Sequence, residues 1–282
     1  MKSYMLLLIC SLLMVSCSSD DSETDNGIIS GDYFPSSLDD SWTYNVENNS
    51  TTNPEFNFMA TDVVTINSAT GNTFTLQVND DTAPANGTMN SIFSTGIFTK
   101  TNSTLNYTGD LSALGALDIL PESDIALTDF VLYDLNAAAN TELYSTEDSF
   151  TQDLDFDGQT LPITTAYDIT NTHVANLNEL TVNDVTYTNV IHTEIRANLE
   201  ISTVITIIIP ITQAILESQD VLILNNYYAE NVGLIKSDAN QSFTISPTFL
   251  PFLNASGAGG EFPTSASVDN IQELESYIVS ED

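Results

Sequence analysis

The sequence predicts a mainly β protein: one curved antiparallel open sheet or half-barrel with few short helices, or alternatively a β-sandwich. Several segments alternate apolar and polar residues with the period of two that a half-buried strand requires. Thr, Asn, Ser and Asp supply most polar positions, a composition that favours strands and turns over helices. Residues 31–282 are long enough to bury a sizeable core as a single domain, and no repeat of fixed period divides them.

The first strands are expected close to the start of this domain. Ser41–Val46 alternates Trp42, Tyr44 and Val46 with polar residues. Residues 60–79 repeat the pattern on both sides of a turn at Gly71, which predicts a hairpin.

Longer strands are expected in the second half of the chain. Residues 150–161 and 167–169 have strand patterns, and residues 186–209 form the longest alternating segment. Beyond Thr203 both faces of that segment become apolar, so we expect it to be covered on two sides. Pro210 is expected to interrupt the ladder, and residues 221–224 to return antiparallel.

Three segments have weaker patterns. Residues 111–120 would form a short helix that Pro121 stops. Residues 249–262, FLPFLNASGAGGEF, fit either a crossover loop on the core or a ligand-facing flap. Residues 273–279 are expected to be a strand, although Asp269 could instead cap a helix there.

The N-terminus has the pattern of a secretory signal over residues 1–16. Lys2 precedes an apolar run from Met5 to Val15, which is too short to cross a bilayer. The sequence MVSC at 14–17 resembles the lipobox of bacterial lipoproteins. The resemblance implies that Cys17 carries a diacylglyceryl thioether and an amide-linked acyl chain, enough for firm membrane anchoring. The alternative is an ordinary secreted protein cut near Ser16.

An acidic tether is expected at residues 17–30. Four carboxylates and no apolar residue lie between Ser18 and Asp25, so this segment cannot pack. It resembles the export signal of surface lipoproteins in the Bacteroidota, which implies an outer-membrane protein facing the medium; that signal would comprise Ser18, Ser19, Asp20, Asp21, Ser22 and Glu23. A solvated spacer on a periplasm-facing lipoprotein is the alternative.

Charge and cysteine content restrict the partners. The sequence has 39 acidic and 4 basic residues, a formal charge of −35, and loss of residues 1–16 makes it one unit more negative. Nucleic acid and anionic membrane surfaces are therefore excluded as electrostatic partners. Cys10 leaves with the signal and Cys17 with the lipid, so no disulfide remains and stability must come from a core.

Three stretches suggest a family. DYFPSSLDDSWTY at 32–44, YYAENVGLIKS at 227–237 and ELESYIV at 273–279 resemble, in order and spacing, Bacteroidota lipoproteins of unassigned function. Those proteins are similar to half-barrels of the LolA and LppX type. The resemblance implies a curved antiparallel sheet whose concave side holds acyl chains.

One acidic stretch has the spacing of a calcium loop. Asp153, Asp155 and Asp157 alternate before Gly158, as in the first half of an EF-hand loop, which would make a weak Ca²⁺ site. Thr164 stands where the bidentate Glu would be required. The competing interpretation is a β-hairpin whose type I′ turn is Asp157-Gly158.

No catalytic pattern stands out, and we expect no enzyme and no cofactor other than that weak calcium. His173 and His192 lack zinc-motif spacing, so each is expected to be a hydrogen-bonded structural histidine, His173 in a loop. No GxSxG motif occurs, and a pair of glycosidase carboxylates has no specific support. Trp42, Tyr227 and Tyr228 would stack on sugar if exposed, but aromatic residues in strands are more often core.

Two functions follow. The first is a non-enzymatic lipid-anchored surface protein that binds an apolar or lipid-like molecule in its concave sheet, with Ile207, Ile209, Phe249 and Phe252 lining the site. The second is an adhesive or accessory module that binds glycan or a partner protein on a solid sheet.

Overall fold

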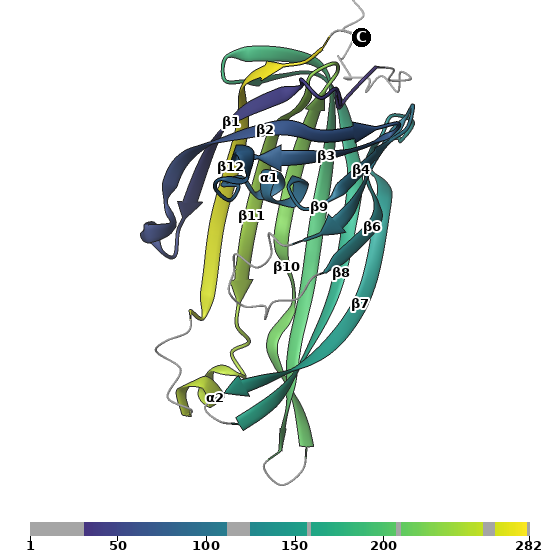
Figure 1. Ribbon diagram of the computed structural model, residues 1–282. Helices are drawn as coiled ribbons and strands as arrows, with labels where there is room; N and C mark the ends of the chain where they lie inside the picture. Colours follow the sequence, from purple (N-terminus) through teal and green to yellow (C-terminus); the bar gives the residue numbers. More distant parts are fainter. Residues whose placement is uncertain (1–30, 112–124, 157–158, 207–209, 256–262, 281–282) are drawn as a thin grey trace, which may run out of the picture.

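A computed structural model describes residues 31–111, 125–156, 159–206, 210–255 and 263–280. Within these ranges the chain forms one twelve-stranded antiparallel sheet that nearly closes into a barrel, with two short α-helices (Figure 1). The predicted fold class is confirmed. The signal, Cys17, the acidic tether with its export signal, and the expected helix at 112–120 lie outside the described residues.

The strands follow one another around the sheet in the order β6-β5-β4-β3-β2-β1-β12-β11-β10-β9-β8-β7. Their bounds are β1 Ser41–Ser50, β2 Phe58–Thr70, β3 Thr73–Val78, β4 Ile97–Lys100, β5 Thr104–Asp110, β6 Ala126–Asp134, β7 Thr141–Phe156, β8 Gln159–Val182, β9 Val185–Thr206, β10 Pro210–Ala229, β11 Gly233–Thr244 and β12 Ser265–Ile278. The helices are η1 Pro54–Phe56, η2 Asn79–Asp81, α1 Thr88–Phe93 and α2 Leu250–Ala255.

The curved sheet places its two halves face to face. The long strands β7–β11 form a wall, and β1–β4 with α1 cross its upper part, whereas α2 lies at the opposite end (Figure 1). Helix α1 contacts β11 and β12, and β6 contacts β8 and β9 across the interior. The core is therefore formed where the N-terminal strands pack on the inner face of the C-terminal wall.

Alternation decides which side chains enter this core. On β9, Ile195, Ala197 and Leu199 are fully buried, while Arg196 and Asn198 between them reach the outer face. The alternation of buried and solvent-facing residues predicted for this strand is confirmed. Because all twelve strands belong to one curved antiparallel sheet, the inward side chains of strands far apart in sequence share one core.

The first strand is tied to the wall by two aromatic side chains. The Trp42 indole Nε1–H donates to the carbonyl of Val232 at 2.6 Å, and the Tyr44 hydroxyl donates to the carbonyl of Leu234 at 2.8 Å. Gly233 between these carbonyls has φ +107°, a backbone conformation that favours glycine. Trp42 is 1% exposed, so the alternative in which it stacks on sugar is wrong.

A buried carboxylate organises the segment before α1. Asp62 on β2 accepts hydrogen bonds from the side chains of Asn79, Asn86 and Asn90 and from the backbone of Asn86 and Gly87. Burial acts to raise the pKa of Asp62, but these hydrogen bonds outweigh it and hold the pKa below its ordinary value. Asp62 thereby holds residues 79–90 against the sheet.

Two expectations about the far end of the wall change. Pro210 does not interrupt the ladder but begins β10, paired with Thr206. Val204 and Ile211 remain 40% and 52% exposed, so this end is not covered on two sides. Val204 alternates along β9 with Thr203, which is 1% exposed on the inner face, so Val204 faces outward.

Candidate functional site

The candidate site is a row of polar side chains on the inner face of the wall. Residues directly opposed in neighbouring strands share one face of a sheet. The ladder aligns His173 with Thr193, Thr193 with Asn226, Asn226 with Ser237, and Ser237 with Gln272. These five residues, the polar row, cross β8 to β12, and each is at most 1% exposed.

One end of the row is satisfied by protein groups. The Gln272 amide donates to Asn90 Oδ1 at 2.8 Å and accepts from the Asn90 backbone N–H at 3.3 Å. The Ser237 hydroxyl donates to Asn226 Oδ1 at 2.8 Å. Helix α1 is therefore the partner of this end of the row.

The other end lacks protein partners. The Thr193 hydroxyl and the Asn226 Nδ2 are buried without a hydrogen bond, and the ring nitrogens of His173 make none of good geometry, although the Asn176 side chain lies close enough to act on the pKa of His173 as a hydrogen-bond partner. Buried polar groups are almost always paired with protein, ordered water or a ligand, because an unpaired one costs about 1–3 kcal/mol. His173, Thr193 and Asn226 form the unpaired end of the row, three neighbouring polar side chains among the buried groups that lack a protein partner.

Burial also determines the charge of the histidine. Desolvation lowers the pKa of His173, and the nearby Asn176 amide and Asp134 carboxylate oppose this effect without overcoming it. The imidazole is therefore neutral at pH 7, with one donor and one acceptor nitrogen. The expected loop position is wrong, since His173 lies in β8, and its ring nitrogens make no hydrogen bond of good geometry.

Polar groups continue on one side of the unpaired end. Asn176 pairs with Ile191, and Ile191 with Tyr228, in the adjacent row of the ladder. The Tyr228 hydroxyl and Asn176 Oδ1 are also buried without partners, and burial raises the pKa of Tyr228 far above its ordinary value. Tyr228 packs edge-on against Tyr133 of β6 at a ring-centroid distance of 5.3 Å, so it belongs to the core and not to a sugar-stacking surface.

An apolar surface continues on the other side. Ile195 pairs with Leu224, and Ala197 pairs with both Ile169 and Leu222. These five side chains, the apolar wall, are fully buried. The inner face is thus amphipathic along the strands: neutral polar groups give way to aliphatic groups within two residues.

The outer face carries the other aromatic candidate. Tyr227 stacks on His192 with ring centroids 4.4 Å apart and an interplanar angle of 15°. His192 Nε2 shares a hydrogen bond of 2.8 Å with Asn225 Oδ1, which confirms His192 as a hydrogen-bonded histidine. Burial and the Asp238 carboxylate raise the pKa of Tyr227, so its hydroxyl is neutral and available as a donor.

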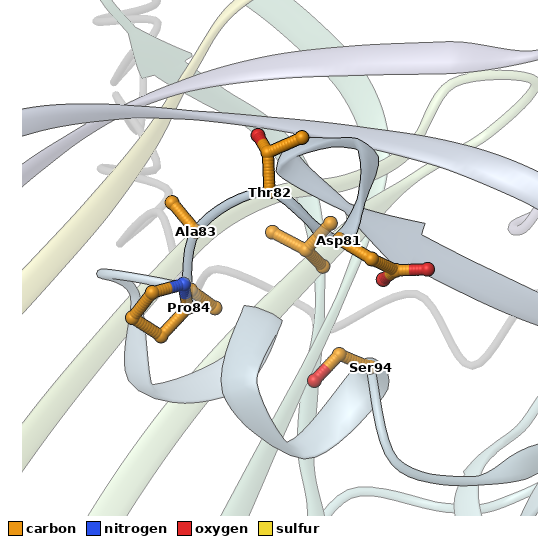
Figure 2. Close-up of a pocket in the computed structure, with 7 residues that line it drawn as sticks. Asp81, Thr82, Ala83, Pro84 and Ser94 are labelled. Atoms are coloured by element: carbon orange, nitrogen blue, oxygen red, sulfur yellow. The ribbon is translucent and has the colours of Figure 1, made fainter.

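Two surface hollows are less informative. The first, of about 350 Å³, lies between η2 and α1 and is lined by Val78, Asp81, Thr82, Ala83, Pro84, Ala85 and Ser94 (Figure 2). Its polar groups are engaged locally, because Asp81 accepts from Gln77 and Ser94 donates to the carbonyl of Ser91. The second, of about 420 Å³, lies over β7–β10 and includes Glu147, Asp148, Asp168 and Glu200.

The residues predicted to line a ligand site are not brought together with the polar row. Ile207 and Ile209 lie outside the described residues. Phe249 is half-buried and stacks on Phe252, which is 38% exposed at the start of α2. Both phenylalanines lie at the end of the wall that β1–β4 do not cross (Figure 1).

The calcium candidate falls partly outside the described residues. Asp153 and Asp155 lie on β7, and the register of Phe156 with Gln159 is that of the predicted hairpin; Asp157 is not described. In the described ranges, no three His, Cys, Asp or Glu side chains are grouped to hold a metal ion.

Sequence reasoning missed the polar row. Its signal was present as small or amide residues at the inward positions of otherwise apolar strands, such as Thr193 before Ile195 and Asn226 after Leu224. The strand register was needed to align them.

Comparisons with protein-family models, with curated proteins and with solved structures return no match for this chain. In the described part of the chain, no helix is both long and apolar enough to cross a membrane. The inner face of the sheet is therefore the feature from which a function is proposed.

Proposed function

We propose that this protein is a non-enzymatic, lipid-anchored envelope lipoprotein that binds an amphiphilic, lipid-like molecule on the inner face of its curved sheet. One observation carries the proposal: the unpaired end of the polar row adjoins the apolar wall. A molecule with a hydrogen-bonding head would pair with the polar groups, and its aliphatic tail would take the place of the core side chains that now cover the apolar wall. The resemblance to half-barrel lipoproteins supports the same class of ligand.

The binding test uses the full chain carrying Cys17→Ser, which removes the acceptor of the lipid anchor and leaves every described residue unchanged. We expect native mass spectrometry and solvent extraction to find a co-purified acyl species. Unfolding in guanidinium, removal of lipid and refolding should lower the melting temperature, and returning the extract should restore it. An unloaded mass, together with an unchanged melting temperature, would contradict the proposal.

The anchor is tested separately in living cells. Radiolabelled palmitate should be incorporated into the wild-type chain and not into Cys17→Ser, and the variant should leave the membrane fraction. Replacement of Asp20, Asp21 and Glu23 by Ala should retain anchoring but abolish cleavage by protease added outside the cells. Unchanged cleavage would support the periplasm-facing or spacer interpretation of the tether.

A second function, glycan binding, is favoured by the Tyr227–His192 stack on the outer face. An aromatic ring flanked by amide and carboxylate groups suits the apolar face and hydroxyls of a sugar ring. On a glycan array, Tyr227→Ala would abolish binding, whereas Tyr277→Ala, an exposed tyrosine on β12, would retain it. Absence of binding by the wild-type chain would remove this candidate.

A further inference from the structure

The sheet has two edges, and they differ in how they are protected. In the described chain the strand order begins with β6 and ends with β7, so each of these strands has a paired neighbour on one side only. The β6 edge is short and irregular: β6 has nine residues, and its ladder with β5 shifts register twice. The Asn171 side chain also donates to the carbonyls of Val131 and Leu132 on β6. Short length, irregularity and covering groups are the usual protection of a sheet edge.

The β7 edge is long and regular. β7 has 16 residues, and from Tyr144 to Phe156 its pairing with β8 runs without a register shift. In an antiparallel ladder, every second residue turns its backbone N–H and C=O away from the neighbouring strand. The N–H of Ser149 is such a group, because it donates to the Asp148 carboxylate at 2.7 Å and not to β8. The β7 edge is thus a row of backbone groups that no other described strand pairs.

Charge determines which chain suits this edge. Glu147, Asp148 and Asp153 are exposed along β7, and the strand contains no basic residue. The hollow of about 420 Å³ over β7–β10 continues this charge with Asp168 and Glu200. A second copy would bring the same carboxylates to the same edge, and like charges on neighbouring strands are unfavourable. A strand with lysine or arginine side chains would instead be attracted.

The alternation of β7 determines where those basic residues would lie. Phe150 is half-buried, opposes the fully buried Thr165 and packs on Tyr167 with ring centroids 6.5 Å apart, so it belongs to the inner face. Glu147 and Asp153 have the opposite parity and lie on the outer face. A strand added to β7 would continue both faces. Its inward side chains would be apolar, beside Phe150, and its outward side chains basic, beside Glu147 and Asp153.

We infer that the edge of β7, residues 145–153, is a docking site for an extended segment of a partner protein that alternates basic and apolar residues and adds to the sheet as a further strand. Backbone hydrogen bonds supply the affinity in this mode of recognition, and the side chains beside the added strand supply the specificity. The inference goes beyond the proposed function and does not depend on a ligand inside the sheet.

The test titrates the full chain carrying Cys17→Ser with three fluorescent peptides at low ionic strength. The first is KVKVKVK, the second is the same peptide with N-methylated backbone amides, and the third is EVEVEVE. We expect KVKVKVK to bind at least about tenfold more tightly than either of the others, because only it has both the charge and the backbone donors. Amide exchange should slow in β7 when it binds, and not in β12. No binding of KVKVKVK, or equal binding of the N-methylated peptide, would overturn the inference.

Matched variants locate the edge. Ser149→Pro removes an N–H that faces away from β8, and proline is tolerated on edge strands, so this variant should fold and bind KVKVKVK about tenfold more weakly. Joint replacement of Glu147 and Asp153 by Lys should have a similar effect. The control replaces Glu55 and Glu275, exposed on η1 and β12, by Lys; it changes net charge equally and should alter binding less than about twofold. Equal effects of the two charge variants would reduce the binding to net charge. A dimer of the wild-type chain that Ser149→Pro dissociates would make a second copy the occupant. Either result would overturn the inference.

Discussion

His173 and Thr193 face each other directly across the β8–β9 ladder, both fully buried and without a hydrogen bond to each other. Two opposed polar residues on the buried face of a sheet normally pair with each other or with a neighbour. Asn226, which opposes Thr193 from β10, accepts from Ser237 through its side-chain oxygen and leaves its amide nitrogen unpaired. The core therefore contains neighbouring polar side chains for which the fold supplies no hydrogen-bond partner of good geometry.

The burial of His173 predicts its titration. Its pKa is lowered in the folded protein, so as pH falls the unfolded chain takes up a proton before the native chain does. This group should therefore reduce the free energy of unfolding as pH falls through its ordinary pKa of about 6.5. Two-dimensional NMR of the imidazole should show His173 titrating below that ordinary pKa, and His173→Gln should flatten the pH dependence of stability in this range. Protonation of His173 at or above its ordinary pKa would contradict the prediction.

The carboxylate of Asp62 should be a major determinant of stability. Asp62→Asn places an NH₂ group against backbone and amide donors, so we expect a loss of about 2–4 kcal/mol in urea unfolding. Asp168→Asn, at an exposed position of β8, is the matched control and should change stability by less than about 0.5 kcal/mol.

Asp62 should also account for part of the loss of stability at low pH. Because the folded pKa of Asp62 is lowered, its contribution is present above the ordinary aspartate pKa and is lost as pH falls through the folded value. The difference in stability between wild type and Asp62→Asn should shrink below about pH 4. A constant difference down to pH 2 would show that the carboxylate charge is unimportant.

The only tryptophan of the sequence reports on the contact between β1 and the β10–β11 turn. Trp42→Phe would leave the carbonyl of Val232 unpaired and remove buried ring area, costing about 2–4 kcal/mol. Native Trp42 fluorescence should resist acrylamide quenching and become quenchable on unfolding. Tyr277→Phe, at a partly exposed position of β12, serves as the control and should leave stability nearly unchanged.

One buried amide links β6 to the wall by hydrogen bonds, beside the packing of Tyr133 on Tyr228. The Asn171 side chain donates to the carbonyls of Val131 and Leu132 on β6, and β6 and β7 are the two ends of the sheet order. Asn171→Ala should lower stability by about 1–3 kcal/mol and speed amide exchange in β6 more than in β9 or β10. Uniform acceleration across the sheet would indicate global destabilisation instead.

Much of the fold was readable from periodicity. The alternation around Trp42, the turn at Gly71 and the two-faced pattern of β9 depend on near neighbours in sequence, and each is confirmed. The expectation that this end of the wall is covered on two sides is wrong, because Val204 lies on the outer face and single apolar side chains are often exposed on protein surfaces.

The sequence by itself determined the fold class and the inward positions of the strands. Only the tertiary structure decided which polar residues meet, because residues as distant as His173 and Gln272 come to lie in one row through the register of five strands. Register depends on the sum of many cross-strand contacts, which no local pattern encodes. The packing of β6 and α1 on the inner face then left one end of that row paired and the other without a protein partner.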